Sequence, residues 1–150
     1  MTLFFSFVMA CFITMALIPP LRRSAERLKF VDVTDGRKIH SGVMPRIGGI
    51  AMVAGTVLPM LMWLELTRQA SAFLIGVAII VAFGVWDDRK DLDYRLKFFG
   101  QTLAIGVVVW YGEVLIRWLP FAGGLEIPLY VSALLTGFIL LGVTNAVNLA

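Results

Sequence analysis

The chain has 150 residues, of which 59% are hydrophobic and 15% are charged, and its formal net charge is +3. Soluble domains carry about 45–50% apolar and about 25% charged residues, so this composition excludes a soluble globular protein and indicates a membrane protein. No basic stretch is interleaved with aromatic residues, which argues against nucleic-acid binding.

Five segments are apolar and long enough to cross a bilayer, which takes about 20 residues of helix. In chain order they are Leu3–Leu21, Ile47–Leu66, Ala70–Trp86, Phe98–Leu119 and Leu129–Leu149. We therefore predict an all-α, polytopic membrane protein with about five transmembrane helices, organised as one membrane domain over residues 1–150. The first segment has no positive charge before it, which favours a retained helix over a cleaved signal peptide. Pro19 and Pro20 lack the backbone N–H donor and are predicted to end this helix.

The basic residues concentrate in two polar loops. Seven of the 13 Lys and Arg residues lie within Arg22–Arg46 and four within Asp87–Lys97, whereas Arg68 and Arg117 lie in or beside the alternate loops. Because cytoplasmic loops are enriched in Lys and Arg, both large loops are predicted to be cytoplasmic. The amino terminus is then outside, and the carboxyl end of the fifth helix is cytoplasmic. Cys11 is the only cysteine in the sequence, so no internal disulfide can form.

Four acids follow the third apolar segment, in the sequence Trp-Asp-Asp-Arg-Lys-Asp-Leu-Asp at residues 86–93. In a continuous helix, Asp87 and Asp88 lie four and three residues before Asp91, so the three carboxylates share one face. Like charges repel unless a cation binds among them, and Mg²⁺ commonly bridges carboxylates to substrate phosphates. The cluster therefore predicts a metal and phosphate site at a membrane surface. The alternative is a solvated loop with extended basic side chains.

Two further polar groups are predicted on the same cytoplasmic side. Arg37, Lys38 and His40 of the first loop can bind a pyrophosphate or another anion. Asn145 and Asn148 lie three residues apart near the end of the fifth helix, where an amide costs free energy unless it is hydrogen-bonded. Each group has an ordinary alternative, namely a surface histidine beside basic residues and an asparagine pair that joins helices. Together with the acids they favour phosphoryl transfer, which needs mainly positioning and charge neutralisation.

Three segments also carry the pattern of one enzyme family. The first segment, residues 32–49, reads Asp-Val-Thr-Asp-Gly-Arg-Lys-Ile-His-Ser-Gly-Val-Met-Pro-Arg-Ile-Gly-Gly. The second, residues 84–91, reads Gly-Val-Trp-Asp-Asp-Arg-Lys-Asp, with Lys97 and Gln101 downstream. The third, residues 144–149, reads Thr-Asn-Ala-Val-Asn-Leu. They resemble the first cytoplasmic loop, the aspartate-rich loop and the start of the next motif of the polyprenyl-phosphate N-acetylhexosamine-1-phosphate transferases. The spacing Arg-Lys-x-His is more similar to the N-acetylglucosamine-type branch than to the muramoyl-pentapeptide branch.

The resemblance implies transfer of a sugar 1-phosphate, of the N-acetylglucosamine type, from a UDP-sugar to undecaprenyl phosphate with release of UMP. It implies Mg²⁺, with Mn²⁺ as the alternative, on the cytoplasmic face of a bacterial inner membrane, at the start of cell-envelope polysaccharide synthesis. By the same resemblance Asp87, Asp88 and Asp91 are the catalytic acids, and Asp87 and Asp88 are the metal ligands. The substrate-binding residues it implies are Arg37, Lys38, His40, Asn145 and Asn148.

The sequence departs from the family pattern in two places. Thr34 stands where the family usually has a proline, and the sequence ends at Ala150, where the family motif continues with Asp-Gly-x-Asp-Gly. We therefore expect an amino-terminal half of a ten- or eleven-helix transferase that is inactive alone. The alternatives are a phospho-N-acetylmuramoyl-pentapeptide transferase, an intramembrane aromatic prenyltransferase, and a non-enzymatic transporter or structural subunit. The prenyltransferase usually has an asparagine just before its first acid, whereas Trp86 precedes Asp87 in this chain. A transporter places polar groups near the bilayer midplane, whereas the strongest polar cluster here is predicted at the interface.

Overall fold

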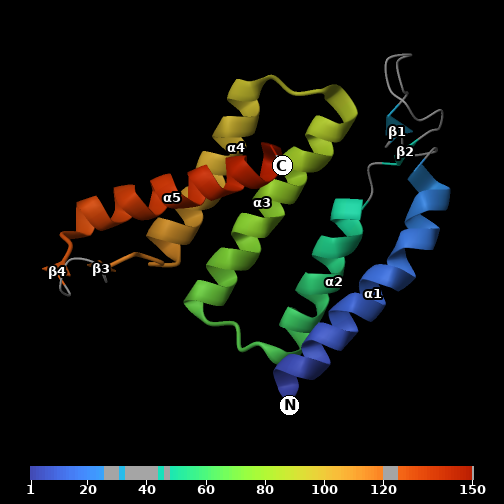
Figure 1. The fold of residues 1–150 in the computed structure, drawn as a ribbon, viewed down its shortest axis with the longest axis horizontal. Coiled ribbons are helices and arrows are strands. Elements are labelled where there is room, and N and C mark those ends of the chain that lie inside the picture. The colour runs from blue at the N-terminus through green and yellow to red at the C-terminus, as the bar shows by residue number, and fades with distance from the viewer. Residues whose placement is uncertain (26–30, 33–43, 46–47, 120–124, 150) are drawn as a thin grey trace. The chain divides into compact units, whose positions relative to one another are not determined.

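The computed structural model describes residues 1–25, 31–32, 44–45, 48–119 and 125–149 of the chain. Contacts within the chain group it into two compact units, shown as a ribbon in Figure 1. The first unit comprises Met1–Glu65 and Asp88–Asp91, and the second comprises Leu66–Asp87 and Leu92–Ala150. The organisation of residues 1–150 as one membrane domain stays a prediction.

The first unit is built on two helices, α1 (Thr2–Ala25) and α2 (Gly48–Trp63). Two short strands that follow α1 in the sequence, β1 (Val31–Asp32) and β2 (Met44–Pro45), pair antiparallel. The prediction that Pro19 and Pro20 end the first helix is wrong, because α1 continues through both to Ala25. A proline removes one backbone donor, but its fixed φ is compatible with helix, so the cost here does not stop the helix.

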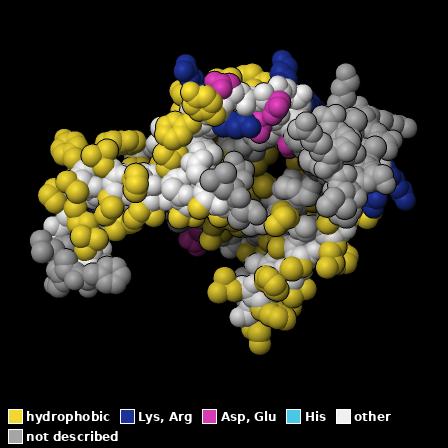
Figure 2. Space-filling model, turned by 45° about the horizontal axis from the view of Figure 1, so that its top comes forward, with side chains coloured by type: hydrophobic (Ala, Val, Ile, Leu, Met, Phe, Trp, Pro, Cys, Tyr) yellow, Lys and Arg dark blue, Asp and Glu magenta, His cyan; other side chains and the backbone are white. Residues whose placement is uncertain are grey.

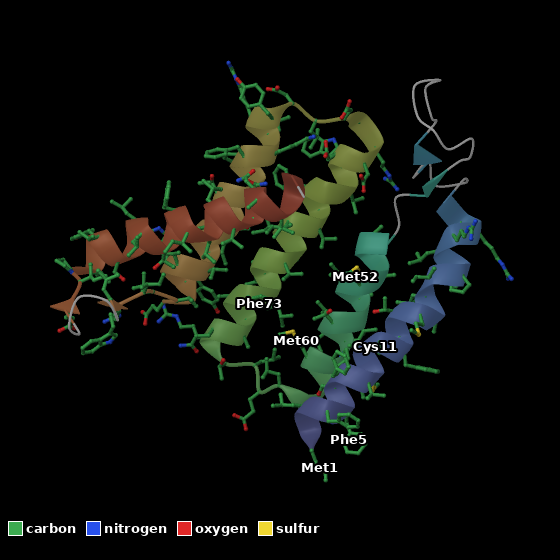
Figure 3. The ribbon with its side chains drawn as sticks, in the orientation of Figure 1. Met1, Phe5, Cys11, Met52, Met60 and Phe73 are labelled. Carbon is green, nitrogen blue, oxygen red and sulfur yellow. The ribbon has the colours of Figure 1, made fainter. Side chains whose placement is uncertain are left out.

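Small residues let α1 and α2 approach each other closely. The buried residues of α2 are Ala51, Gly55 and Pro59, which recur every four residues on one face. A Cβ atom at Gly55 would overlap the Thr14 hydroxyl of α1, so glycine is required at this crossing. Cys11, labelled on α1 in Figure 3, is exposed.

The second unit contains most of the remaining helices that the structure describes. It is built from α3 (Arg68–Lys90) as far as Asp87, α4 (Tyr94–Gly106), the π-helical turn η1 (Val107–Tyr111) and α5 (Leu129–Leu149). The strands β3 (Trp118–Leu119) and β4 (Leu125–Glu126) pair antiparallel before α5 begins.

The fourth helical segment ends earlier than the apolar run predicts. The run extends to Leu119, but the helix stops at Tyr111, and Glu113 has a left-handed φ of 53°. Two buried hydroxyls of α5 stabilise the chain beyond it: the Ile116 N–H donates to Thr136 Oγ1 at 2.8 Å, and Ser132 Oγ donates to the Ile116 carbonyl at 2.7 Å. The backbone therefore finds partners on another helix, so it does not need to stay helical.

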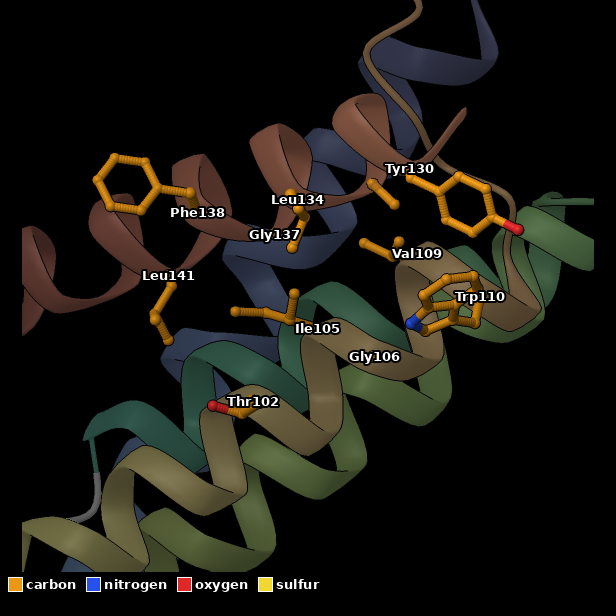
Figure 4. A pocket seen from close by; sticks show the side chains of 11 residues that line it. Thr102, Ile105, Gly106, Val109, Trp110, Tyr130, Leu134, Gly137, Phe138 and Leu141 are labelled. Atoms are coloured by element: carbon orange, nitrogen blue, oxygen red, sulfur yellow. The ribbon is translucent and has the colours of Figure 1, made fainter. Parts of the chain in front are cut away.

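An apolar groove of about 420 Å³ runs between α4 and α5 (Figure 4). Gly106 and Gly137 contribute no side chain to it, and Trp110 and Tyr130 lie together at one end. Aromatic residues of this kind are enriched at membrane–water interfaces, which agrees with this end of the unit being an interfacial one.

Among the described residues, three helical stretches are long and apolar enough to cross a membrane, and the shorter Gly48–Trp63 helix is also apolar. The three are Leu3–Ser24, Arg68–Lys90 and Leu129–Val147. Large hydrophobic side chains cover much of the visible surface in Figure 2, and Phe138 on α5 is 76% exposed. This outward hydrophobicity suits a lipid environment. The all-α membrane fold is confirmed, whereas the number of five spans and their orientation stay predictions.

Candidate functional site

The turn from α3 to α4 is organised by the side chain of Asp87. The Leu92 N–H donates to Asp87 Oδ1 at 2.9 Å, and Lys97 Nζ lies 2.9 Å from the same oxygen. Leu92 is buried, whereas the side chains of Asp87 and Lys97 are 28% and 36% exposed. One carboxylate therefore fixes the backbone of the turn and pairs with a cation that is only partly solvated.

The helix end itself differs from the sequence-based expectation. α3 ends at Lys90, and Asp91 follows with a left-handed φ of 48°. The prediction that Asp87, Asp88 and Asp91 share one face of a continuous helix is therefore wrong for Asp91. A left-handed residue is a common way to stop a helix, and Asp tolerates it better than most residues other than glycine.

Asp87 and Lys97 line a cavity of about 280 Å³ formed by the last turns of α3, the first half of α4 and the end of α5. Gln101 and Thr144 are its other polar residues. The remaining lining residues are apolar, and they are Ile80, Phe83, Gly84 and Val147. The cavity thus places a carboxylate, an ammonium group, an amide and a hydroxyl around a small space with an apolar wall.

Close packing of α3 on α4 holds the cavity wall in place. A Cβ atom at Gly100 would lie 2.5–2.8 Å from three ring atoms of Phe83, so only glycine leaves room for the ring. The Phe83 ring also packs edge-on against Phe99, with 6.3 Å between centroids. Such aromatic pairs add to the stabilisation that burial alone gives.

Asn145 joins α4 and α5 next to this cavity. Its Nδ2 donates to Gln101 Oε1 at 2.9 Å and to the Leu141 carbonyl at 2.9 Å. The predicted need of this amide for a hydrogen-bonding partner is thereby met by protein. The alternative interpretation of Asn145, as a residue that joins helices, agrees with this contact.

The structure brings together part of the predicted site. Asp87 lies at the cavity, and Asn145 contacts it through Gln101. Asp88 lies in the last turn of α3 and belongs to the first unit. Arg37, Lys38, His40 and the side chain of Asn148 lie outside the described residues. The roles predicted for all of these residues remain predictions.

Three lining residues had no assigned role in the sequence-based prediction: Lys97, Gln101 and Thr144. The first two are four residues apart and so lie on one face of α4, which a helical reading of residues 94–106 would have shown. Thr144 directly precedes Asn145. In the described ranges, no group of three or more His, Cys, Asp and Glu side chains is arranged to hold a metal ion.

Comparison with known proteins identifies relatives along most of the chain. A protein of Bacillus subtilis named probable undecaprenyl-phosphate N-acetylglucosaminyl 1-phosphate transferase is 29% identical over 96% of this chain and 41% of its own length. A decaprenyl-phosphate N-acetylglucosaminephosphotransferase of Mycobacterium tuberculosis is 32% identical over 93% of this chain and 37% of its own length. An undecaprenyl-phosphate alpha-N-acetylglucosaminyl 1-phosphate transferase of Escherichia coli is 31% identical over 59% of this chain and 24% of its own length.

These relatives extend beyond the region of similarity, and the chain spans about 41% of the length of the Bacillus protein. No solved structure matches the chain. The model of the family described as glycosyl transferase family 4 matches residues 70–150, which include α3 from Ala70 onward, α4, α5 and every residue that lines the cavity. Because this match covers more than half of the chain, the protein belongs to glycosyl transferase family 4.

Proposed function

We propose that the intact protein transfers N-acetylglucosamine 1-phosphate from a UDP-sugar to undecaprenyl phosphate and releases UMP. The observation that carries this proposal is the cavity lined by Asp87, Lys97 and Gln101, side chains of the apolar helices α3 and α4. The names of the relatives, which specify N-acetylglucosamine and a polyprenyl phosphate, support the choice of sugar and acceptor over the muramoyl-pentapeptide alternative.

In the proposed reaction, a phosphate oxygen of the lipid attacks the β-phosphorus of the UDP-sugar. A new P–O–P linkage forms, the bond between the α- and β-phosphates breaks, and its electron pair leaves with UMP. The protein must therefore neutralise several phosphate charges and hold two substrates in line. Lys97 supplies a fixed positive charge at the cavity, where a partly desolvated ammonium group attracts phosphate more strongly than one in bulk water.

Magnesium is the cofactor that suits the proposed donor set, with Mn²⁺ as the alternative. Mg²⁺ is commonly bound by one or two carboxylates together with substrate phosphates, and Asp87 and Asp88 are adjacent carboxylates of this kind. Both described contacts of Asp87 go to Oδ1, and a carboxylate has a second oxygen that can accept. When bound, the ion would add positive charge beside the phosphates. Asp91 remains a proposed catalytic acid.

The proposed site is on the cytoplasmic face of the bacterial inner membrane. The excess of Lys and Arg in the two large loops supports this orientation, and it gives a soluble UDP-sugar access from the cytoplasm while the lipid arrives from the bilayer. Arg37, Lys38, His40 and Asn148 are proposed to bind substrate from the same side.

The test is turnover of the intact protein with Mg²⁺, UDP-N-acetylglucosamine and undecaprenyl phosphate, followed as UMP release and as formation of the lipid-linked sugar. Asp88→Asn should abolish turnover. Asp93→Asn is the matched control, because Asp93 precedes α4 and its side chain makes no capping hydrogen bond there. Unchanged turnover in Asp88→Asn would contradict the role of the acids. Turnover only with UDP-N-acetylmuramoyl-pentapeptide would instead assign the other branch.

A further inference from the structure

Asn145 fixes which way round the Gln101 amide lies. The Leu141 carbonyl can only accept a hydrogen bond, so the Asn145 group facing it must be the Nδ2 donor. The same nitrogen donates its second N–H to Gln101, which must therefore present Oε1 to Asn145. The Leu141 carbonyl of α5 thus sets the orientation of the Asn145 amide, and the Asn145 amide sets the orientation of the Gln101 amide on α4.

The consequence for Gln101 is that its Nε2 is the end left for the cavity. Oε1 accepts from Asn145, and Nε2 makes no hydrogen bond to any residue that the structure describes. Thr144, which also lines the cavity, already donates its hydroxyl hydrogen to the Leu140 carbonyl at 2.8 Å. The side-chain donors that remain at the cavity are therefore those of Gln101 and the ammonium hydrogens of Lys97 not used by Asp87.

We propose that Gln101 is a substrate-binding residue that donates a hydrogen bond to a phosphate oxygen, and that Asn145 is a positioning residue that acts through Gln101. This inference rests on the proposed function, and it gives a role to Gln101, which the sequence-based prediction placed in the aspartate-rich motif without one. It also changes the role predicted for Asn145 from direct contact with substrate to orientation of the residue that makes this contact.

Gln101→Glu separates this role from simple joining of helices. The carboxylate still accepts from Asn145, so the contact between α4 and α5 is retained, but the donor to the cavity is replaced by an acceptor with negative charge. We expect the KM of one substrate to rise roughly 10- to 100-fold, as for loss of a hydrogen bond to a charged group, with an unchanged Tm. Gln69→Glu makes the same chemical change at an exposed position near the start of α3 and should leave the KM of each substrate and the Tm unchanged.

Asn145→Asp provides a second, independent variant. An aspartate at this position can only accept, so the Gln101 amide should turn its Nε2 toward it and present Oε1 to the cavity. This variant should raise the same KM as Gln101→Glu, although residue 101 is unchanged. In a Gln101→Leu background, which has no amide to turn, Asn145→Asp should raise this KM no further, because the donor is already absent. Independent, multiplying effects would overturn the positioning role of Asn145.

The source of the phosphate is resolved by titrating each substrate while the other is saturating. A raised KM for undecaprenyl phosphate assigns the contact to the lipid phosphate, and a raised KM for UDP-N-acetylglucosamine assigns it to the nucleotide diphosphate. Unchanged kcat/KM for both substrates in Gln101→Glu would overturn the inference. Thermal stabilisation by each substrate without turnover gives a separate readout: loss of stabilisation in Gln101→Glu supports phosphate binding even if the wild-type protein transfers no sugar.

Discussion

The two ends of the second unit use polar side chains in different ways. At the end near the turn from α3 to α4, the Asp87–Lys97 pair lines a cavity, and its side chains are 28% and 36% exposed. At the opposite end, Arg68 pairs with Glu113 at 2.8 Å, and these side chains are 50% and 55% exposed. The Arg68 guanidinium also lies 5.7 Å from the centroid of the Tyr111 ring.

Buried hydroxyls sharpen the contrast. Ser132 and Thr136 are the buried polar residues among those the structure describes. Ser132 Oγ donates to the Ile116 carbonyl, and Thr136 Oγ1 accepts from the Ile116 N–H and donates to the Ser132 carbonyl. They stabilise a non-helical segment and offer no donor to a ligand. A polar residue in an apolar bundle therefore indicates a site only when some of its donors or acceptors remain directed at a cavity, as with Lys97 and Gln101.

The largest expected effect is that of Lys97→Met. This variant removes the positive charge from the cavity and leaves Asp87 without its cation. We expect kcat/KM to fall about 100-fold or more, as when one preorganised electrostatic contact to the reacting group is lost. Steady-state kinetics of the intact protein measure it. Lys97→Arg keeps the charge and should retain more activity than Lys97→Met; equal losses in the two variants would contradict a role as a cation.

At the opposite end, Thr136→Val should affect stability and leave kinetics unchanged. The substitution keeps the shape of the side chain but leaves the Ile116 N–H without an acceptor. We expect the free energy of unfolding to fall by about 1–3 kcal/mol, the cost of an unsatisfied buried donor. Thr102→Val is the matched control, since its exposed hydroxyl donates only to the Phe98 carbonyl. A large loss of kcat/KM per folded molecule in Thr136→Val would show that this end also serves the reaction.

The sequence predicts some of these features and not others, for identifiable reasons. Apolar runs located each of the long helices that the structure describes, because membrane length and hydrophobicity are local properties. They placed the end of the fourth segment wrongly because the partners of Ile116 lie on α5, 16 and 20 residues away. The acids were found as a group, yet the left-handed Asp91 and the pairing of Asp87 with Lys97 depend on how the turn closes. The Gln101–Asn145 contact spans 44 residues, so no local pattern reports it.

The smallest expected effect is that of Arg68→Met, and it completes the comparison. Its ion pair is about half exposed, so solvent screens it and its loss should cost about 0–1 kcal/mol of unfolding free energy. The cation–π contact with Tyr111 adds little at such an exposed position. The kinetic constants should match those of the wild type, because this pair faces no part of the cavity lined by Asp87. Thermal unfolding and kinetics of Arg68→Met beside Lys97→Met measure both ends at once. If Arg68→Met and Lys97→Met lowered kcat/KM by similar factors, the loss in Lys97→Met would not be specific to the cavity. The cavity would then not be the place where the phosphates bind.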